Sequence, residues 1–193
     1  MFPYAHPFDS WREDATQGQA PSVFGALPYP SGFPTSDYFT YQFTEFQPDI
    51  FNCTVVGPQL QICYKVLTDE HNPGYTVLKD DKDKNTALIE WQTRPLVEIR
   101  SVLPKRPVGD WLPLSAAKIS RTMELKGTTY TWAPQDKSVN LYSGSHATIA
   151  CLAKIFRGQN QLTLEITPNV LELDILEGVV VSTLLIQCGR NID

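Results

Sequence analysis

The chain has 193 residues and a formal charge of −5 at pH 7. This length suits one domain of ordinary size and is too short for two full hydrophobic cores. Hydrophobic residues make up 42% of the chain and charged residues 19%, so it can bury a core and is not globally disordered. The acidic balance argues against a protein that binds nucleic acid over its whole surface, because neutralising phosphates needs a basic field.

From the sequence we expect neither a targeting signal nor a membrane span. The start, Met-Phe-Pro-Tyr, lacks the basic residues and the continuous apolar core of a signal peptide. The longest apolar stretch, 179–186, is interrupted by Ser182 and Thr183 and is far shorter than the roughly 20 residues that a spanning helix needs. Cysteine and histidine spacing matches no metal site. We therefore expect a cytoplasmic protein with free, buried thiols and no metal.

Residues 1–35 differ in composition from the rest of the chain. They hold six of the fifteen prolines together with seven aromatic residues. Prolines at this spacing prevent a regular helix or strand. The aromatic content is nevertheless higher than a solvated linker tolerates. We expect an extended N-terminal arm that docks on one domain formed by residues 36–193.

From residue 38 onward, short apolar runs alternate with a period of two, and turn residues bound each run. Turns at Gly57-Pro58, at Asn72-Pro73-Gly74 and over 157–160 suggest that sequential strands pair with each other. So many short strands at close spacing indicate an antiparallel barrel or sandwich. The eleven predicted strands are 38–46, 50–56, 60–67, 75–79, 86–92, 96–102, 118–126, 128–132, 139–142, 147–156 and 161–167.

The segment 170–188 can be interpreted in two ways. Its β-branched run at 179–181 favours a strand, because branched side chains crowd a helix. Its length without a turn favours a helix. Beyond Gly178 the apolar residues fall on all sides of a helical wheel, which is typical of a helix enclosed by protein.

Five short motifs occur in an order that resembles a known family. They are Ala87-Leu88-Ile89-Glu90-Trp91, Leu103-Pro104-Lys105, Tyr130-Thr131-Trp132, Leu164-Glu165-Ile166 and Leu173-Asp174-Ile175-Leu176. The family is fungal, abundant in mushrooms, of unassigned function and similar to tubby-like and LURP-one-related proteins. The resemblance covers roughly residues 42–188. It implies a mainly β fold, a closed antiparallel tubby-like barrel of about twelve strands around one hydrophobic C-terminal helix near 171–188. The chain also resembles pink, pigment-binding chromoproteins of mushroom fruiting bodies.

Catalytic residues are not evident. Three histidines are present, and the Ser145-His146 pair lies in a segment that lacks the second glycine of a nucleophile elbow, since position 147 is alanine. No phosphate-binding loop marks a cofactor site. We expect a non-enzymatic protein, with a small hydrolase built on Ser145 and His146 as the enzymatic alternative.

The leading hypothesis is a protein that binds a small, flat, largely apolar ligand, such as an aromatic chromophore, between barrel wall and central helix. Trp91 and Trp132 would supply aromatic walls. Glu177 would accept a hydrogen bond from the ligand, or would instead compensate the dipole of the helix at its first turn. The predicted helix residues of the site share one face at three- and four-residue spacing: Glu177, Val180, Val181 and Leu184.

The alternative partner is an anionic membrane surface. Residues 94–126 carry seven basic and three acidic side chains, against the acidic balance of the whole chain. In tubby-like proteins a basic surface binds phosphoinositide headgroups, so the resemblance implies the same for Lys105, Arg106 and Arg121. A solvated charged face of several strands explains the same composition.

Overall fold

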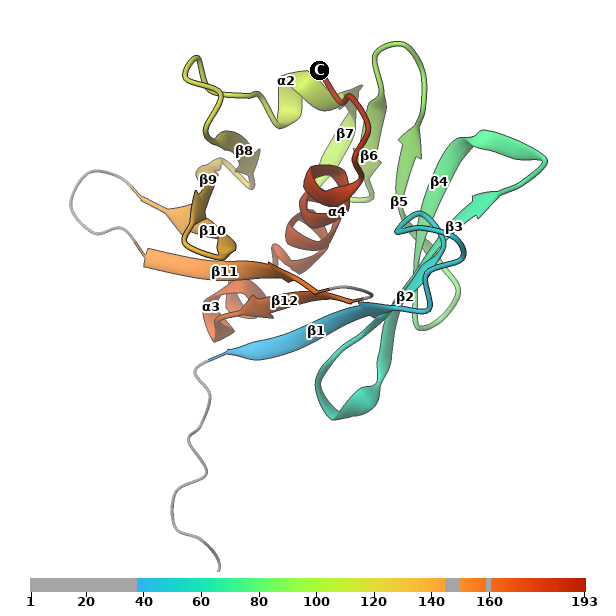
Figure 1. Cartoon of the computed structure of the whole chain (residues 1–193), viewed down its shortest axis with the longest axis horizontal. Helices are drawn as coiled ribbons and strands as arrows, with labels where there is room; N and C mark the ends of the chain where they lie inside the picture. Colours follow the sequence, from blue (N-terminus) through green and yellow to red (C-terminus); the bar gives the residue numbers. More distant parts are fainter. Residues whose placement is uncertain (1–37, 145–149, 159–160) are drawn as a thin grey trace, which may run out of the picture. The chain divides into compact units, whose positions relative to one another are not determined.

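The computed structural model describes residues 38–144, 150–158 and 161–193, which lie in one structural unit, Asp37–Asp193 (Figure 1). The predicted arm of residues 1–35 lies outside the described residues. The candidate hydrolase pair, Ser145 and His146, lies outside them too.

Twelve antiparallel strands form one sheet in the order β7-β6-β5-β4-β3-β2-β1-β12-β11-β10-β9-β8. Sequential strands pair with each other as predicted, except for β7 and β8, and β1 pairs with β12 in the middle of the sheet. The strands are β1 (Phe39–Thr44), β2 (Cys53–Val56), β3 (Ile62–Asp69), β4 (Asn72–Asp80), β5 (Asn85–Glu90), β6 (Leu96–Ile99), β7 (Leu103–Pro107), β8 (Arg121–Leu125), β9 (Thr128–Gln135), β10 (Ser138–Ser143), β11 (Ala150–Arg157) and β12 (Leu162–Ile166).

The sheet curls into a nearly closed barrel around the helix α4 (Leu176–Gln187), which Figure 1 shows in the middle with strands around it. The predicted β-barrel around a helix is therefore confirmed. The barrel is not fully closed, because β7 and β8 pair with no strand on their outer edges. The short helix α2 (Val108–Trp111) connects these two edge strands and packs against both. Its buried Trp111 donates a hydrogen bond from Nε1 to the carbonyl of Glu124 on β8, at 3.2 Å.

Strand β7 was not predicted, and its sequence explains why. Pro104 and Pro107 lack the backbone N–H that a central strand uses, so the pattern does not indicate a strand. At the edge of a sheet this donor is not needed on the outer side. The prolines thus suit β7 to the edge position that it occupies.

The prediction of one helix near 171–188 is wrong in its bounds. The structure has a short helix α3 (Pro168–Glu172), a break at residues 173–175 and then α4. Asp174 in the break has a φ of 52°, in the left-handed region, which a right-handed α-helix cannot continue through. As a consequence, Glu172 lies at the C-terminal end of α3. Glu177 is the acidic residue in the first turn of α4.

The rest of α4 is enclosed by the barrel, which decides between helix and strand for this segment. All residues from Gly178 to Leu185 are buried. The hydroxyl groups of Ser182 and Thr183 donate to the carbonyl of Val179 one turn earlier, at 3.0 and 2.8 Å. The backbone groups and these two hydroxyls form their hydrogen bonds within the helix. The apolar side chains on all sides of the helix can therefore pack against the strands without leaving a buried polar group unpaired.

Among the described residues, no helix is long and apolar enough to cross a membrane. No group of potential metal-ligating side chains was found within the same residues. All four cysteines are free; Cys53 is buried, whereas the other three are partly exposed, contrary to the expectation of buried thiols.

Candidate ligand-binding site

Four of the six predicted ligand-binding residues are part of the packed core or its edge. Val180, Val181 and Leu184 are buried and belong to the hydrophobic core cluster between helix and barrel wall. Trp132 is buried as well, and its Nε1 donates to Ser182 Oγ at 3.0 Å. These four residues hold the helix in the barrel.

Trp91 lies near the other end of α4. Its ring meets Phe51 edge to face, with 4.9 Å between centroids, and its Nε1 donates to Thr76 Oγ1 at 2.8 Å. The guanidinium of Arg190, which follows α4, lies 4.7 Å from the Trp91 ring centroid. A twelve-residue helix is about 18 Å long, so Trp91 and Glu177 lie near opposite ends of it. The six predicted residues therefore do not form one site.

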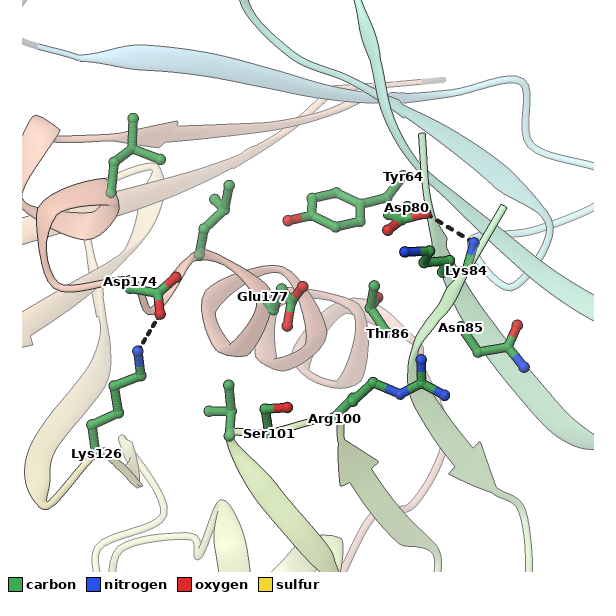
Figure 2. Close-up of a pocket in the computed structure, with 13 residues that line it drawn as sticks. Tyr64, Asp80, Lys84, Asn85, Thr86, Arg100, Ser101, Lys126, Asp174 and Glu177 are labelled. Atoms are coloured by element: carbon green, nitrogen blue, oxygen red, sulfur yellow. Dashed lines mark hydrogen bonds and ion pairs between the residues drawn. The ribbon is translucent and has the colours of Figure 1, made fainter. Parts of the chain in front are cut away.

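A pocket of about 450 Å³ opens beside the N-terminal end of α4, and we call it the α4 pocket. Glu177 is the one predicted ligand-binding residue that lines it. Its walls come from β3, from the end of β4, the start of β5 and the turn between them, from the turns that follow β6 and β8, and from α3, the break after it and the first turn of α4 (Figure 2). The lining residues are Tyr64, Asp80, Lys84, Asn85, Thr86, Arg100, Ser101, Val102, Lys126, Leu171, Asp174, Leu176 and Glu177.

Tight turns present these side chains. In the turn between β4 and β5, Asp80 Oδ1 accepts hydrogen bonds from the backbone N–H groups of Lys82 and Lys84, both at 2.9 Å. Ser101, Lys126 and Asp174 have φ values of 61°, 51° and 52°, a left-handed conformation that costs a non-glycine residue about 1–2 kcal/mol.

Half of the six charged residues around the α4 pocket already have partners. Asp80 is engaged by the turn that it caps. Lys126 and Asp174 form an ion pair with each other (Figure 2). The side chains of Lys84, Arg100 and Glu177 have no hydrogen-bond or ion-pair partner among the residues that the structure describes.

Two neighbouring polar groups face this pocket without a partner. Burial raises the pKa of Glu177, and the charges of Asp174 and Asp80 raise it further, whereas Lys126 lowers it. Tyr64 is 8% exposed, and no partner for its hydroxyl exists within the described part of the chain. Burial raises the pKa of Tyr64, and the negative charge of Glu177 raises it further. Figure 2 shows both on the pocket side of α4.

The comparisons with known proteins give a family but no activity. Residues 48–191 match DUF6593, a family of unknown function. The chain belongs to this family. A search of curated proteins found no match for this DUF6593 protein. An Arabidopsis thaliana protein of known X-ray structure is similar, with 12% identity and a TM-score of 0.43 over 75% of this chain and 88% of that chain. The fungal, tubby-like and chromoprotein resemblances stay predictions.

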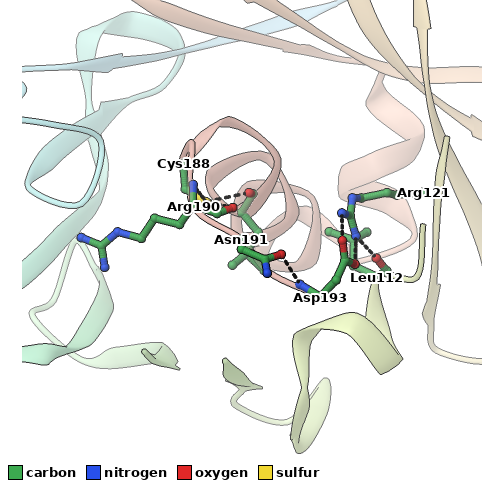
Figure 3. Close-up of polar contacts among 7 residues, drawn as sticks. Leu112, Arg121, Cys188, Arg190, Asn191 and Asp193 are labelled. Atoms are coloured by element: carbon green, nitrogen blue, oxygen red, sulfur yellow. Dashed lines mark hydrogen bonds and ion pairs between the residues drawn. The ribbon is translucent and has the colours of Figure 1, made fainter. Parts of the chain in front are cut away.

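The predicted lipid-binding residues of this DUF6593 protein do not form a free basic patch. Lys105 forms an ion pair with Glu90. Arg121 is held by Asp193 through two hydrogen bonds of 2.8 Å and by the Leu112 carbonyl at 2.8 Å (Figure 3). Arg106 is exposed. Two of the three cations are thus neutralised within the chain, which disfavours the membrane-surface alternative.

Tyr64 and Lys84 were not among the candidate site residues predicted from the sequence, and Arg100 belonged only to the basic stretch 94–126 of the membrane-surface alternative. The sequence pattern predicts that Lys84 is a solvent-exposed turn residue and that Tyr64 is one of the inward-facing residues of an ordinary strand. The order of the strands in the sheet, and not a local sequence pattern, places these residues in the same pocket as Glu177.

Proposed function

We propose that the protein is a non-enzymatic small-molecule-binding protein and that its ligand occupies the α4 pocket. The observation that supports this is that the half-buried carboxylate of Glu177 and the hydroxyl of Tyr64, a residue that is only 8% exposed, both line the pocket without a partner among the described residues. Polar groups removed from water cost free energy unless something bonds to them. A ligand that supplies these bonds would stabilise the folded chain.

The dimensions and the chemistry of the pocket fit this role. Small-molecule sites occupy about 300–1,000 Å³ and place a few polar groups at defined positions. The lining contains Ser101 and Tyr64, but no hydrogen bond joins either hydroxyl to a base among the described residues, as an activated nucleophile requires. Binding therefore explains the site better than turnover does.

The finer proposal is that the ligand is a pigment. The space between wall and helix is filled by Val180, Val181 and Leu184, so a pigment would occupy the α4 pocket instead. Six charged residues line this pocket, which favours a ligand with polar groups over a purely apolar one.

A spectrum and an extract test both proposals. We expect the full-length protein to release a small molecule on denaturation, detected by mass spectrometry, and this molecule to raise the thermal midpoint of ligand-free protein. Tyr64→Phe and Glu177→Gln should each weaken its binding about tenfold, the value of one hydrogen bond to a charged group. The control Glu172→Gln removes an exposed carboxylate outside the pocket and should bind as the parent does.

Visible absorption of the purified protein tests the pigment separately. A colourless protein with a bound molecule would retain the binding function and reject the pigment. A protein that releases no small molecule and whose thermal midpoint responds to no compound of a metabolite collection would refute the binding function itself.

A further inference from the structure

The charges of the α4 pocket that remain after internal pairing are of both signs. Asp80 is bonded within its own turn, and Lys126 is paired with Asp174. What remains is one carboxylate, Glu177, and two cations, Lys84 and Arg100. A ligand in this pocket meets both kinds of charge.

These opposite charges belong to different walls. Glu177 projects from the first turn of α4, whereas Lys84 precedes β5 and Arg100 follows β6 (Figure 2). Neither cation lies within 4.0 Å of the Glu177 carboxylate, since no ion pair joins them. The carboxylate and the two cations thus come from different parts of the pocket lining and do not neutralise each other by direct contact.

Ligands of a single charge fit this arrangement poorly. An anion near Lys84 and Arg100 would also meet Glu177 and its neighbours Asp80 and Asp174, whose charges already disfavour a further negative group. A simple cation at Glu177 would leave both basic residues without a partner. An apolar ligand would remove water from all three groups and return no hydrogen bond.

We propose that the ligand of the α4 pocket is amphoteric, with an amine cation bound to Glu177 and an acidic oxygen group bound to Arg100 and Lys84. This inference rests on the proposed binding function and names the chemical class of the ligand. The Tyr64 hydroxyl, next to Glu177, accepts a second hydrogen bond from the amine. The acidic group is a carboxylate or a phosphate, since guanidinium and ammonium groups bind either.

Matched probes separate these classes. The full-length protein is titrated with ω-amino acids from glycine to 6-aminohexanoate, with phosphoethanolamine, and with hexylamine and hexanoate as single-charge controls. Calorimetry gives the affinities, and NMR shifts of pocket residues give the location. We expect at least one amphoteric probe to bind about tenfold or more tightly than either single-charge control, because it gains one additional charged hydrogen bond. The tighter amphoteric probe identifies carboxylate or phosphate.

Variants assign the two ends of the ligand. Glu177→Gln should reduce the affinity for the best amphoteric probe about tenfold and leave that for hexanoate unchanged or higher. Arg100→Gln should reduce the affinity for the best amphoteric probe about tenfold and leave the affinity for hexylamine unchanged. Glu172→Gln and Arg106→Gln remove exposed charges outside the pocket and should change nothing. Circular dichroism confirms that each variant is folded.

Each outcome is informative about one proposal or both. Equal binding of hexanoate or hexylamine at the pocket would overturn the amphoteric class and leave the binding function standing. A co-purifying molecule that lacks either an amine or an acidic group would do the same. If no probe shifts a pocket residue at millimolar concentration, the inference is wrong, and the extract then decides whether the binding function survives.

Discussion

At Glu177 the folded chain holds a proton more tightly than the unfolded chain does. Burial, then Asp174 and Asp80, raise the pKa of this carboxyl above its ordinary value. Between the ordinary pKa and the raised one, the folded state binds more protons than the unfolded state. The contribution of this group to stability is therefore complete below the ordinary carboxyl pKa of about 4.3 and is lost as the pH rises through the raised value.

Replacing Glu177 by Gln should remove this pH dependence. The variant keeps the shape of the side chain and cannot ionise, so its thermal midpoint should exceed that of the parent at pH 7. The two midpoints should converge near about pH 3.5, where the parent carboxyl is protonated in both states. Melting curves at several pH values measure this, with Glu172→Gln as the control that leaves the pH profile unchanged. A parent more stable than the variant at pH 7 would show that favourable interaction with the α4 dipole outweighs burial.

At the scale of elements, α4 enters the barrel through a close approach to β8. Gly178 is buried in the helix, and a Cβ at this position would lie 2.6 and 2.7 Å from the two terminal carbons of Leu125. Leu125 is itself buried and cannot move into solvent. The glycine thus sets the distance between helix and wall at the point where the α4 pocket ends.

Gly178→Ala should destabilise the fold, although alanine favours a helix by about 1 kcal/mol over glycine. We expect a net loss of about 1–3 kcal/mol from overpacking. Leu125→Ala should cost about 2–5 kcal/mol through the space that it leaves. The double variant should lose less free energy of unfolding than the sum of the two single losses, because the added methyl group at position 178 occupies space that Leu125→Ala leaves.

Urea unfolding of the four proteins measures this cycle. Gly74→Ala serves as the control, since its nearest new contact would be an ordinary 3.8 Å and its change should stay within about 0.5 kcal/mol. Additive losses in the double variant would mean that Gly178 and Leu125 do not limit the approach of the helix.

At the scale of the whole molecule, α4 is the core around which the strands are arranged. Its residues from Gly178 to Leu185 are buried, and the strands contribute alternate inward side chains to the same cluster. Buried residues of α2 and of the segments around the two C-terminal helices, such as Trp111, Val170 and Ile175, complete this cluster. Folding of the sheet and burial of the helix should therefore be one cooperative event.

Two leucines test this dependence. Leu184 is 1% exposed in α4, and Leu173, just before the helix, is 46% exposed. Leu184→Asp should abolish the folded barrel, because a buried unpaired carboxylate costs several kcal/mol against a total stability of roughly 5–15 kcal/mol. Leu173→Asp should stay within about 0.5 kcal/mol of the parent. Leu184→Ala, with a loss of about 2–5 kcal/mol, keeps a folded reference.

Circular dichroism, gel filtration and thermal melting of these variants give the result. A soluble Leu184→Asp protein that melts with the parent would contradict an enclosed α4. A Leu173→Asp protein that fails to fold would show that the segment before the helix is also part of the core.

Most strands can be predicted from the amino-acid sequence alone, because inward and outward residues alternate along each of them. The sequence did not determine β7, whose prolines are compatible with a strand only at an edge, and the edge exists only in the assembled sheet. It also left 170–188 open between strand and helix. The tertiary structure favours the helix, because the barrel buries this segment on all sides and the packing outweighs the weak helix preference of the β-branched residues 179–181.

The candidate site depended still more on the tertiary structure. Glu177 was predicted to contact a ligand, but its expected partners Trp91 and Trp132 pack elsewhere. Tyr64, Arg100 and Glu177 are far apart in the chain and meet because β1 pairs with β12 and the curled sheet surrounds α4. Alternation is a local property that neighbouring residues display, whereas a pocket made of turns arises from contacts between distant segments, which no local pattern records.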